Sequence, residues 1–340
     1  MVPDEARGGE SLVPSVMRLV WGFMVSQAIH VAAKMSIFDR LRDGPRTAVE
    51  LAEATQCHAL ALRRLLRLLT TVELLIEDEQ GRFSVTPMGD LLRADHPQSA
   101  RAYAVMYGEP FIWRAWGDLF GAVQTGTPAF DRVHGESFFA HLAHHPTDAA
   151  VFNAGMTSSS SLDQAAILNA YDFSGFVRIV DVAGGHGALL QGILERCPNA
   201  SGVLCDLPAV LAGAHAIEGS NVAPRCELVG MDMFRSVPAN GDAYVLKRVV
   251  HDWSDAEAIS ILRNCRSAIA LTGRLLLIET VVKPPNQPDP AKCMDVNMLV
   301  LLTGRERTED EFRELYASSG FRLTRIVPAG RISIIEGVPV

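Results

Sequence analysis

Apolar residues recur at helical spacing through most of the first hundred residues. Three runs carry this pattern: residues 16–41, 47–54 and 59–75. They predict three helices, the first ending at the chain-breaking combination Asp43-Gly44-Pro45. Two strand-like runs follow with Gln80-Gly81 between them, which predicts a hairpin. Helices followed by a hairpin are typical of a winged-helix module, so residues 1–100 are predicted to form a helical winged-helix-like domain.

The pattern changes to short β-rich runs alternating with helical segments after residue 177. The runs are residues 177–183, 201–206, 226–232, 243–249 and 274–280. Such alternation predicts crossover units and a parallel sheet, and two further runs near the C-terminus predict a terminal strand pair. Residues 101–172 are mainly helical in pattern and rich in Phe, Trp and Met. We therefore predict a second, α/β domain over residues 101–340. Its helical first part, residues 101–172, is predicted to form the region of an apolar pocket for a small molecule.

Charge argues against DNA binding by the winged-helix module. The chain has a formal net charge of −8, and acidic residues crowd the predicted wing: Glu73, Glu77, Asp78 and Glu79. Like charges repel phosphate, so we expect no nucleic-acid partner. A winged-helix regulator that senses a small molecule stays open as an alternative. The very apolar first helix predicts burial against another surface, for which a second copy of the chain is the natural candidate.

Several features predict a cytoplasmic protein without a membrane partner. The N-terminal MVPDEARGGE has acidic residues and no apolar segment, unlike a signal peptide. No uninterrupted apolar stretch reaches the roughly 18 residues that span a bilayer. The six cysteines are scattered without a CxxC pair, which favours reduced thiols.

A glycine turn ends the first predicted strand of the α/β domain, in the segment VDVAGGHGALL at residues 180–190. At this place a glycine turn lets the backbone approach a ligand closely. Gly185 and Gly187 match the first two glycines of a dinucleotide-binding G-x-G-x-x-G, but Leu190 stands at the third. The mismatch weakens the pyrophosphate interpretation, and a tight turn without a ligand stays possible.

Carboxylates end the next two predicted strands. Asp206 lies 21 residues after Gly185, where a carboxylate can accept hydrogen bonds from both ribose hydroxyls of an adenosine-containing ligand. Asp232 can accept from an adenine amine, with the apolar side chain of Met233 lying on the ring. Each carboxylate taken alone equally fits a turn or a cap.

His251 follows the fourth predicted strand, in the run KRVVHDWSD at residues 247–255. Ser254 and Glu257 form a capping-box pattern, so a helix should start just after His251. This arrangement places the imidazole above the carboxyl ends of the strands, where open α/β sheets bind ligands. The four positions together, in the order that an adenosyl ligand needs, are more specific than any one of them.

Over almost its whole length the chain resembles the small-molecule O-methyltransferases of the caffeate, hydroxyindole and polyketide-tailoring type. The matching runs are IVDVAGGHGALL, LCDLPAV, GMDMFRSVP, LKRVVHDWSD, LLLIETVV, DVNMLV, GRERTEDEF and SSGF. The resemblance implies a Rossmann-like class I methyltransferase domain with a winged-helix dimerisation domain. It further implies S-adenosyl-L-methionine as cofactor, a homodimer and no metal.

The resemblance also implies roles for individual residues. The cofactor-binding residues would be Asp181, Gly184, Gly185, Asp206, Leu207, Asp232, Met233 and Lys247. His251 would be the general base, flanked and oriented by Glu279 and Glu306, and the acceptor would contact Met156, Asp252 and Met298. Two positions depart from the family pattern. Ala183 replaces the first glycine of the turn, which would have to shift if that position needs a positive φ, and Thr303-Gly304 replaces a glycine pair.

The predicted function is methyl transfer from S-adenosylmethionine to a hydroxyl of a small, aromatic secondary metabolite. Two alternatives share the fold: use of the sulfonium for other chemistry, such as decarboxylation, and methylation of nitrogen or sulfur. The His251-Asp252 pair, together with Glu279 and Glu306, argues against the first of these.

Overall fold

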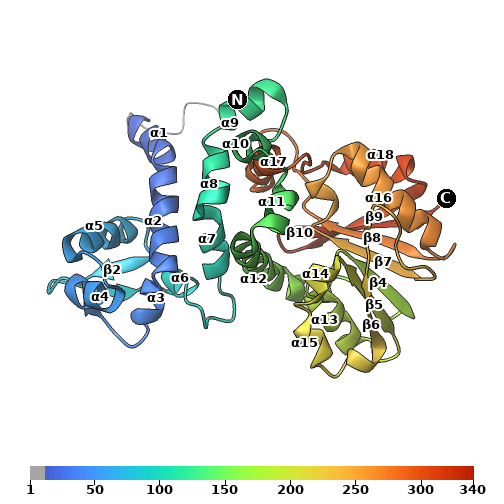
Figure 1. Ribbon diagram of the computed structural model, residues 1–340, viewed down its shortest axis with the longest axis horizontal. Helices are drawn as coiled ribbons and strands as arrows, with labels where there is room; N and C mark the ends of the chain where they lie inside the picture. Colours follow the sequence, from blue (N-terminus) through green and yellow to red (C-terminus); the bar gives the residue numbers. More distant parts are fainter. Residues whose placement is uncertain (1–11) are drawn as a thin grey trace. The chain divides into compact units, whose positions relative to one another are not determined.

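The computed structural model describes residues 12–340, and its contacts divide the chain into two compact units (Figure 1). The first holds the described residues up to Trp113 together with Ala150–Ser158, and the second holds Arg114–Ala149 and Ser159–Val340. The sequence prediction put a domain boundary after residue 100, and it stays a prediction; the first unit continues to Trp113. The N-terminal segment MVPDEARGGE, used above to argue against a signal peptide, lies outside the described residues.

The first unit combines helices with a small antiparallel sheet of order β1-β3-β2. Its elements are α1 (Val13–Val20), α2 (Gly22–Lys34), α3 (Ile37–Arg40), β1 (Arg46–Thr47), α4 (Ala48–Thr55), α5 (Ala59–Thr70), β2 (Leu75–Glu77), β3 (Arg82–Val85), α6 (Pro87–Asp90), α7 (Arg101–Gly108) and most of α8 (Pro110–Trp116). The β2–β3 hairpin turns at Gly81 with φ +71°, which confirms the predicted wing. The predicted helix over 16–41 is instead three helices, because the chain bends by 43° between α1 and α2 and Ser36 takes φ 55°.

Helix α7 belongs to the first unit because it packs on α2. The His30 ring on α2 bonds through Nδ1 to the Val105 carbonyl oxygen at 2.9 Å, and Gly108 lies so close to this ring that a Cβ there would be 2.1 Å from its Cγ. Contacts of this kind depend on side-chain packing between distant segments, which a local pattern does not reveal.

An apolar face on α1 and α2 lies exposed in the described chain. Its residues are Val13, Val16, Leu19, Val20, Trp21, Phe23 and Met24, with Leu19 82% exposed. No single described helix is long and apolar enough to cross a membrane, although the bent pair α1 and α2 passes that test when taken together.

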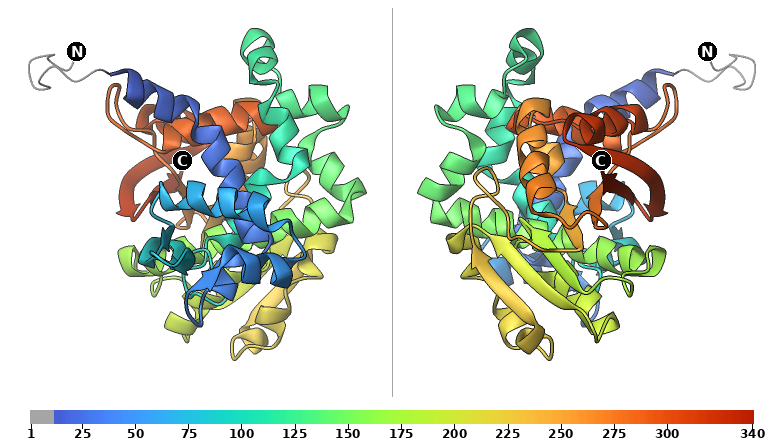
Figure 2. Two further views of the ribbon diagram at one scale, coloured as in Figure 1. Left: turned by 90° about the vertical axis from the view of Figure 1, so that its left-hand side faces the viewer. Right: turned by 90° about the vertical axis from the view of Figure 1, so that its right-hand side faces the viewer.

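A seven-stranded sheet of order β6-β5-β4-β7-β8-β10-β9 forms the centre of the second unit (Figure 2). Its strands are β4 (Arg178–Val182), β5 (Ser201–Asp206), β6 (Cys226–Gly230), β7 (Ala243–Lys247), β8 (Arg274–Glu279), β9 (Phe321–Ala329) and β10 (Ile332–Pro339). The first five run parallel, whereas β10 pairs antiparallel with both β8 and β9. The predicted parallel strands and terminal strand pair are thus confirmed.

Helices cover both faces of this sheet because alternate strand residues point to opposite sides. Val180 and Val182 join a core with α16 and α18, whereas Ile179 joins a second core with α13 and the end of α12. The helices are α9 (Leu119–Thr125), α10 (Ala129–His134), α11 (Phe138–His144), α12 (Pro146–Ala170, shared between the units), α13 (Ala188–Arg196), α14 (Pro208–Leu211), α15 (His215–Glu218), η2 (Ala223–Arg225), η3 (Val250–Asp252), α16 (Asp255–Ala268), α17 (Ala291–Leu301) and α18 (Glu309–Ser318). The crossovers bring the carboxyl ends of β6, β5, β4 and β7 to one edge of the sheet.

Candidate active site

The glycine turn after β4 combines several left-handed residues. Ala183, Gly185 and Gly187 have φ of 54°, 62° and 80°. A Cβ at Gly184 would lie 2.6 Å from the carboxyl carbon of Asp181 and 2.5 Å from Leu204 Cδ1. The turn therefore packs directly on the Asp181 carboxylate, with room for no side chain at Gly184.

Ala183 has a positive φ, the conformation that the sequence analysis named as a source of strain at this position. A left-handed conformation costs an L-residue roughly 1–2 kcal/mol, whereas glycine adopts it freely. We expect Ala183→Gly to raise the free energy of unfolding by about 1 kcal/mol, measured by urea denaturation. Asn240→Gly, at φ 64°, is the matched comparison. Its free energy of unfolding should rise by less, because Asn tolerates this conformation. A loss of stability in Ala183→Gly would contradict this account.

Asp206 links the glycine turn to the end of β5. Its Oδ2 accepts from the Gly185 N–H at 2.8 Å and its Oδ1 from the Leu207 N–H at 2.7 Å. Burial raises the pKa of Asp206, while these two backbone hydrogen bonds act to lower it. Each carboxylate oxygen keeps a further lone pair for a ligand hydroxyl.

Asp181 is a buried carboxyl at the end of β4. Burial raises its pKa to about 7, partly opposed by the positive charge of Lys247 and reinforced by Asp206. Its Oδ1 has no hydrogen-bond partner among the described residues. Since buried polar atoms are normally satisfied, this oxygen suits a ligand that donates a hydrogen bond beside the glycine turn.

The remaining predicted cofactor residues end β6 and β7. Lys247 donates from Nζ to Ser160 Oγ at 2.5 Å, and burial lowers its pKa. Asp232 Oδ1 accepts from the Phe234 N–H at 2.9 Å, so this carboxylate also caps a turn. Met233 is half-buried against the core of the α16 face. The structure thus brings the four predicted motifs to the ends of adjacent strands.

His251 lies in a short 3₁₀ turn rather than directly before a helix. The turn η3 covers Val250–Asp252, and α16 begins only at Asp255, where Ser254 and Glu257 form the predicted capping box. The helix therefore starts at the predicted capping box, and the 3₁₀ turn that precedes it was not predicted. The intervening turn buries the imidazole, which is 6% exposed.

Carboxylates face both nitrogens of His251. Nδ1 lies 3.1 Å from Glu306 Oε1, and Nε2 lies 3.2 Å from Asp252 Oδ1. Burial and the guanidinium of Arg248 act to lower the pKa of His251, but Asp252, Glu279 and Glu306 outweigh them, so the pKa is raised. At a given pH, a larger fraction of this imidazole is therefore protonated than of an ordinary histidine.

Glu279 holds the backbone that precedes His251. Its Oε1 accepts from the N–H groups of Val249 and Val250 at 2.9 and 3.1 Å. Its Oε2 has no hydrogen-bond partner among the described residues, but it lies 4.0 Å from Arg248 Nη1. Burial raises the pKa of Glu279. Burial would also raise the pKa of Glu306, but His251 and Arg248 lower it overall. Of the two glutamates predicted to orient the imidazole, only Glu306 bonds to it.

Arg248 and Arg307, which sequence reasoning missed, complete this cluster together with Gly304. Arg248 donates to Glu306 Oε1 at 3.0 Å and takes φ 56°. The fully buried Arg307 donates to the carbonyl oxygens of Val250 and Trp253 at 2.8 and 3.1 Å. Gly304 lies against the same turn. The sequence did offer a signal for the two arginines, since both are charged residues within the motifs KRVVHDWSD and GRERT.

The predicted acceptor residues lie in different parts of the chain. Asp252 contacts His251, Met298 is 4% exposed on α17, and Met156 belongs to the first unit. Two residues after His251, the ring of Trp253 stacks on that of Phe139, with the ring centroids 5.5 Å apart. The roles of all predicted site residues stay predictions, as does the absence of a metal, although ligand atoms of His251, Glu279 and Glu306 lie within 4.8 Å of one another.

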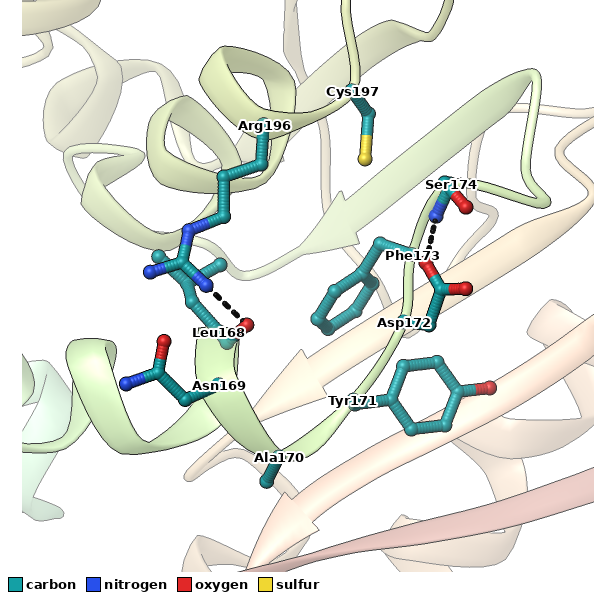
Figure 3. A pocket seen from close by; sticks show the side chains of 9 residues that line it. All are labelled: Leu168, Asn169, Ala170, Tyr171, Asp172, Phe173, Ser174, Arg196 and Cys197. Atoms are coloured by element: carbon teal, nitrogen blue, oxygen red, sulfur yellow. Dashed lines mark hydrogen bonds between the residues drawn. The ribbon is translucent and has the colours of Figure 1, made fainter.

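A hollow of about 450 Å³ lies away from these motifs (Figure 3). It is lined by residues 168–174, which precede β4, and by Arg196 and Cys197 at the end of α13. It therefore lies near the amino end of β4, opposite the glycine turn. The guanidinium of Arg196 points to the Leu168 carbonyl oxygen, so its charge is already engaged.

Comparison with known proteins identifies the family. An O-methyltransferase domain matches residues 116–322, and an O-methyltransferase dimerisation domain matches residues 17–95. The phenazine O-methyltransferase of Lysobacter antibioticus is 41% identical over the full length of both chains. The phenazine-1-carboxylate N-methyltransferase of Pseudomonas aeruginosa is 35% identical over 92% of this chain and 93% of its own.

A solved structure extends this likeness to ligands. The O-methyltransferase from neocarzinostatin biosynthesis, in complex with S-adenosylmethionine and 2-hydroxy-5-methyl naphthoic acid, superposes with a TM-score of 0.81 at 34% identity, covering 93% of this chain and 96% of its own. The chain belongs to the family of S-adenosylmethionine-dependent small-molecule O-methyltransferases. S-adenosylmethionine is its cofactor, and the predicted class I methyltransferase fold with a dimerisation domain is confirmed.

Proposed function

We propose that this enzyme methylates a hydroxyl of a small aromatic secondary metabolite, with His251 as general base. One observation carries the proposal: a buried imidazole, bonded by a carboxylate through Nδ1, follows β7 at the same edge of the sheet as the cofactor motifs. The aromatic side chains of Trp253, Phe139 and Phe234 lie beside this position, which suits a flat apolar acceptor.

The residues at the strand ends fit the cofactor. The Asp181 oxygen without a partner suits an ammonium group, Asp206 suits ribose hydroxyls, and Gly184 leaves no side chain in the way. Asp232 with Met233 would hold the adenine, and Leu207 and Lys247 would complete the binding site. When bound, S-adenosylmethionine supplies an electrophilic methyl group. The protein's contribution is alignment, which in general is worth roughly 7–11 kcal/mol.

As general base, His251 would make the acceptor hydroxyl a better nucleophile. A phenol like that of tyrosine has a pKa of about 10, so little of it is ionised at neutral pH. With its Nδ1–H donated to Glu306, the ring has its lone pair on Nε2, which lies 3.2 Å from Asp252 Oδ1. The acceptor hydroxyl would displace this contact, so that Nε2 takes its proton as the new bond forms. The Glu306 carboxylate then stabilises the imidazolium, as acidic partners do in hydrolase triads.

The raised pKa of His251 sets a pH dependence. Because only neutral imidazole accepts a proton, kcat should rise with pH through this raised pKa. Replacing Asp252 by Asn removes a charge that raises the pKa, so we expect the rising limb of the kcat profile to shift to lower pH. Asp310→Asn, on the exposed surface of α18, should leave the limb in place. A limb that does not move in Asp252→Asn would contradict the assignment to His251.

Homodimer formation belongs to the same proposal. The dimerisation domain spans residues 17–95, and the exposed apolar face of α1 and α2 is the surface that a second copy would cover. A cytoplasmic location, and the absence of nucleic-acid and membrane partners, stay predictions.

Methyl transfer to paired acceptors tests the proposed reaction. The enzyme is incubated with methyl-labelled S-adenosylmethionine and either a hydroxynaphthoate, a hydroxyphenazine or the corresponding arylamine, and the products are identified by NMR. We expect an O-methyl ether from a hydroxylated acceptor and little transfer to the amine. Turnover of the amines alone would favour the nitrogen chemistry named for the Pseudomonas relative. Cofactor binding without transfer to any acceptor would count against an aromatic hydroxyl.

A further inference from the structure

Histidines and carboxylates gather at the junction of α11 and α12, apart from the motifs of the active site. Four of the ten histidines lie between residues 134 and 145, and the cluster that matters consists of Glu136, His141, His144, His145 and Asp148. All five residues belong to the second unit. The reaction proposed above uses none of them.

His141 is the centre of this cluster. Its side chain is 7% exposed, its Nδ1 lies 3.2 Å from Glu136 Oε1, and its Nε2 lies 2.9 Å from Asp148 Oδ2. The ring of His145 stacks on that of His141 at 3.9 Å. Its Nδ1 donates to the His141 carbonyl oxygen at 3.0 Å and lies 3.8 Å from the same Glu136 oxygen. His144 Nδ1 approaches the second Glu136 oxygen at 2.8 Å.

These contacts have the dimensions of a metal site. Glu136, His141 and His145 each offer one ligand atom, and these atoms lie within 4.8 Å of one another. Zinc bonds to histidine nitrogen and carboxylate oxygen at about 2.0–2.2 Å, which sets tetrahedral ligand–ligand separations of roughly 3.3–3.6 Å. The separations of 3.2 and 3.8 Å from Glu136 Oε1 are close to these values.

The charge and the outer partner also fit. Glu136 brings to the cluster a carboxylate, which is ordinarily ionised at neutral pH, and histidine nitrogens face both of its oxygens. Metal-bound histidines usually donate their second ring N–H to a carboxylate, which fixes the tautomer. Asp148 stands in this position on Nε2 of His141.

We propose that Glu136, His141 and His145 bind a divalent first-row metal ion, with Zn²⁺ the best match to two imidazoles and one carboxylate. His144 lies next to the open fourth position, and Asp148 orients His141. On binding, any proton on the two ligating imidazole nitrogens leaves to solvent, the hydrogen bond from His145 Nδ1 to the His141 carbonyl oxygen breaks, and the metal takes the place of the proton.

A metal here would join two helices beside the proposed acceptor residues. Asp148 is in the first turn of α12, whereas His141 is on α11, so the site ties the two together. Helix α11 also carries Phe139, whose ring stacks on Trp253. The proposed ion therefore has a structural role, and it would steady the aromatic contact next to His251.

Zinc binding to the untagged full-length chain tests the proposal. Exposed Cys57 and Cys293 are first changed to Ser, so that thiols do not compete. Zn²⁺ is then titrated against a chromophoric chelator, and melting is followed with and without the ion. We expect one tight Zn²⁺ per chain and a higher Tm with zinc. Affinity should also fall on going from pH 7 to 6, because the ligands must be deprotonated.

Variants separate this site from other sources of zinc affinity. His145→Ala changes a half-exposed side chain and should keep the fold while lowering affinity at least tenfold. Glu136→Gln should act similarly, and Asp148→Asn should cost about 10–100-fold, as expected for an outer partner. His58→Ala, at an exposed histidine of the first unit, and His251→Ala should leave zinc binding unchanged. No tight zinc, equal affinity in His145→Ala and Glu136→Gln, or loss in His251→Ala instead, would each overturn the proposal.

Discussion

Replacing His251 by alanine is expected to lower kcat for a phenolic acceptor by about 10²–10⁴-fold, the usual contribution of a positioned general base. That loss corresponds to roughly 2.7–5.4 kcal/mol of transition-state stabilisation. The affinity for S-adenosylmethionine should stay within a few-fold, because the proposed cofactor contacts come from the ends of β4, β5 and β6 and from Lys247. Steady-state kinetics and cofactor titration measure the two quantities separately.

The acidity of the acceptor makes this prediction sharper. If His251 acts by removing a proton, its loss should matter less as the acceptor hydroxyl becomes more acidic, since an ionised phenolate needs no base. The ratio of wild-type to variant kcat should therefore fall across a series of phenols with pKa from about 10 down to about 7. A ratio that stays constant along the series would assign His251 a role in packing or acceptor binding. Near-wild-type turnover of His251→Ala would remove it from the mechanism.

Local patterns were enough to predict the elements of the sheet. The five parallel strands agree with the predicted runs to within about two residues at each end, because buried strands leave direct periodic signals. The capping box of Ser254 and Glu257 is a contact between residues three apart, and it was also predicted correctly. The 3₁₀ turn at His251 was missed because the capping box marks where α16 starts and gives no signal for the residues before it.

Contacts across the sequence account for what could not be predicted in the site. Glu306 reaches His251 from 55 residues away, and the same oxygen accepts from Arg248. The sequence motif suggested that Glu279 and Glu306 have equal roles. The structure gives them different partners, since Glu279 accepts from two backbone N–H groups. Which carboxylate faces a ring and which faces the backbone depends on the relative placement of β8 and the 302–308 loop, which periodicity does not encode.

Gly304 is predicted to be as sensitive as any catalytic residue, although it carries no chemistry. A Cβ at this position would lie 2.0 Å from the His251 carbonyl oxygen, 2.4 Å from the Asp252 carbonyl carbon and 2.5 Å from the Trp253 nitrogen. All three atoms are backbone, so no side-chain rotation relieves the clash, and the turn that presents His251 must move. We expect Gly304→Ala to lose about 2–3 kcal/mol of stability and about 10²-fold in kcat, the effect of a displacement near 1 Å.

Gly175→Ala is the matched control for this substitution. A Cβ at Gly175 meets nothing within 4 Å, and its φ lies outside the left-handed region, so its stability should change by less than about 0.5 kcal/mol and its kcat should not change. Urea denaturation and steady-state kinetics compare the two variants. Close packing of the 302–308 loop on the His251 turn requires both stability and kcat to fall in Gly304→Ala. If that variant keeps the kcat of the wild type, close packing at Gly304 does not hold the imidazole in its working position.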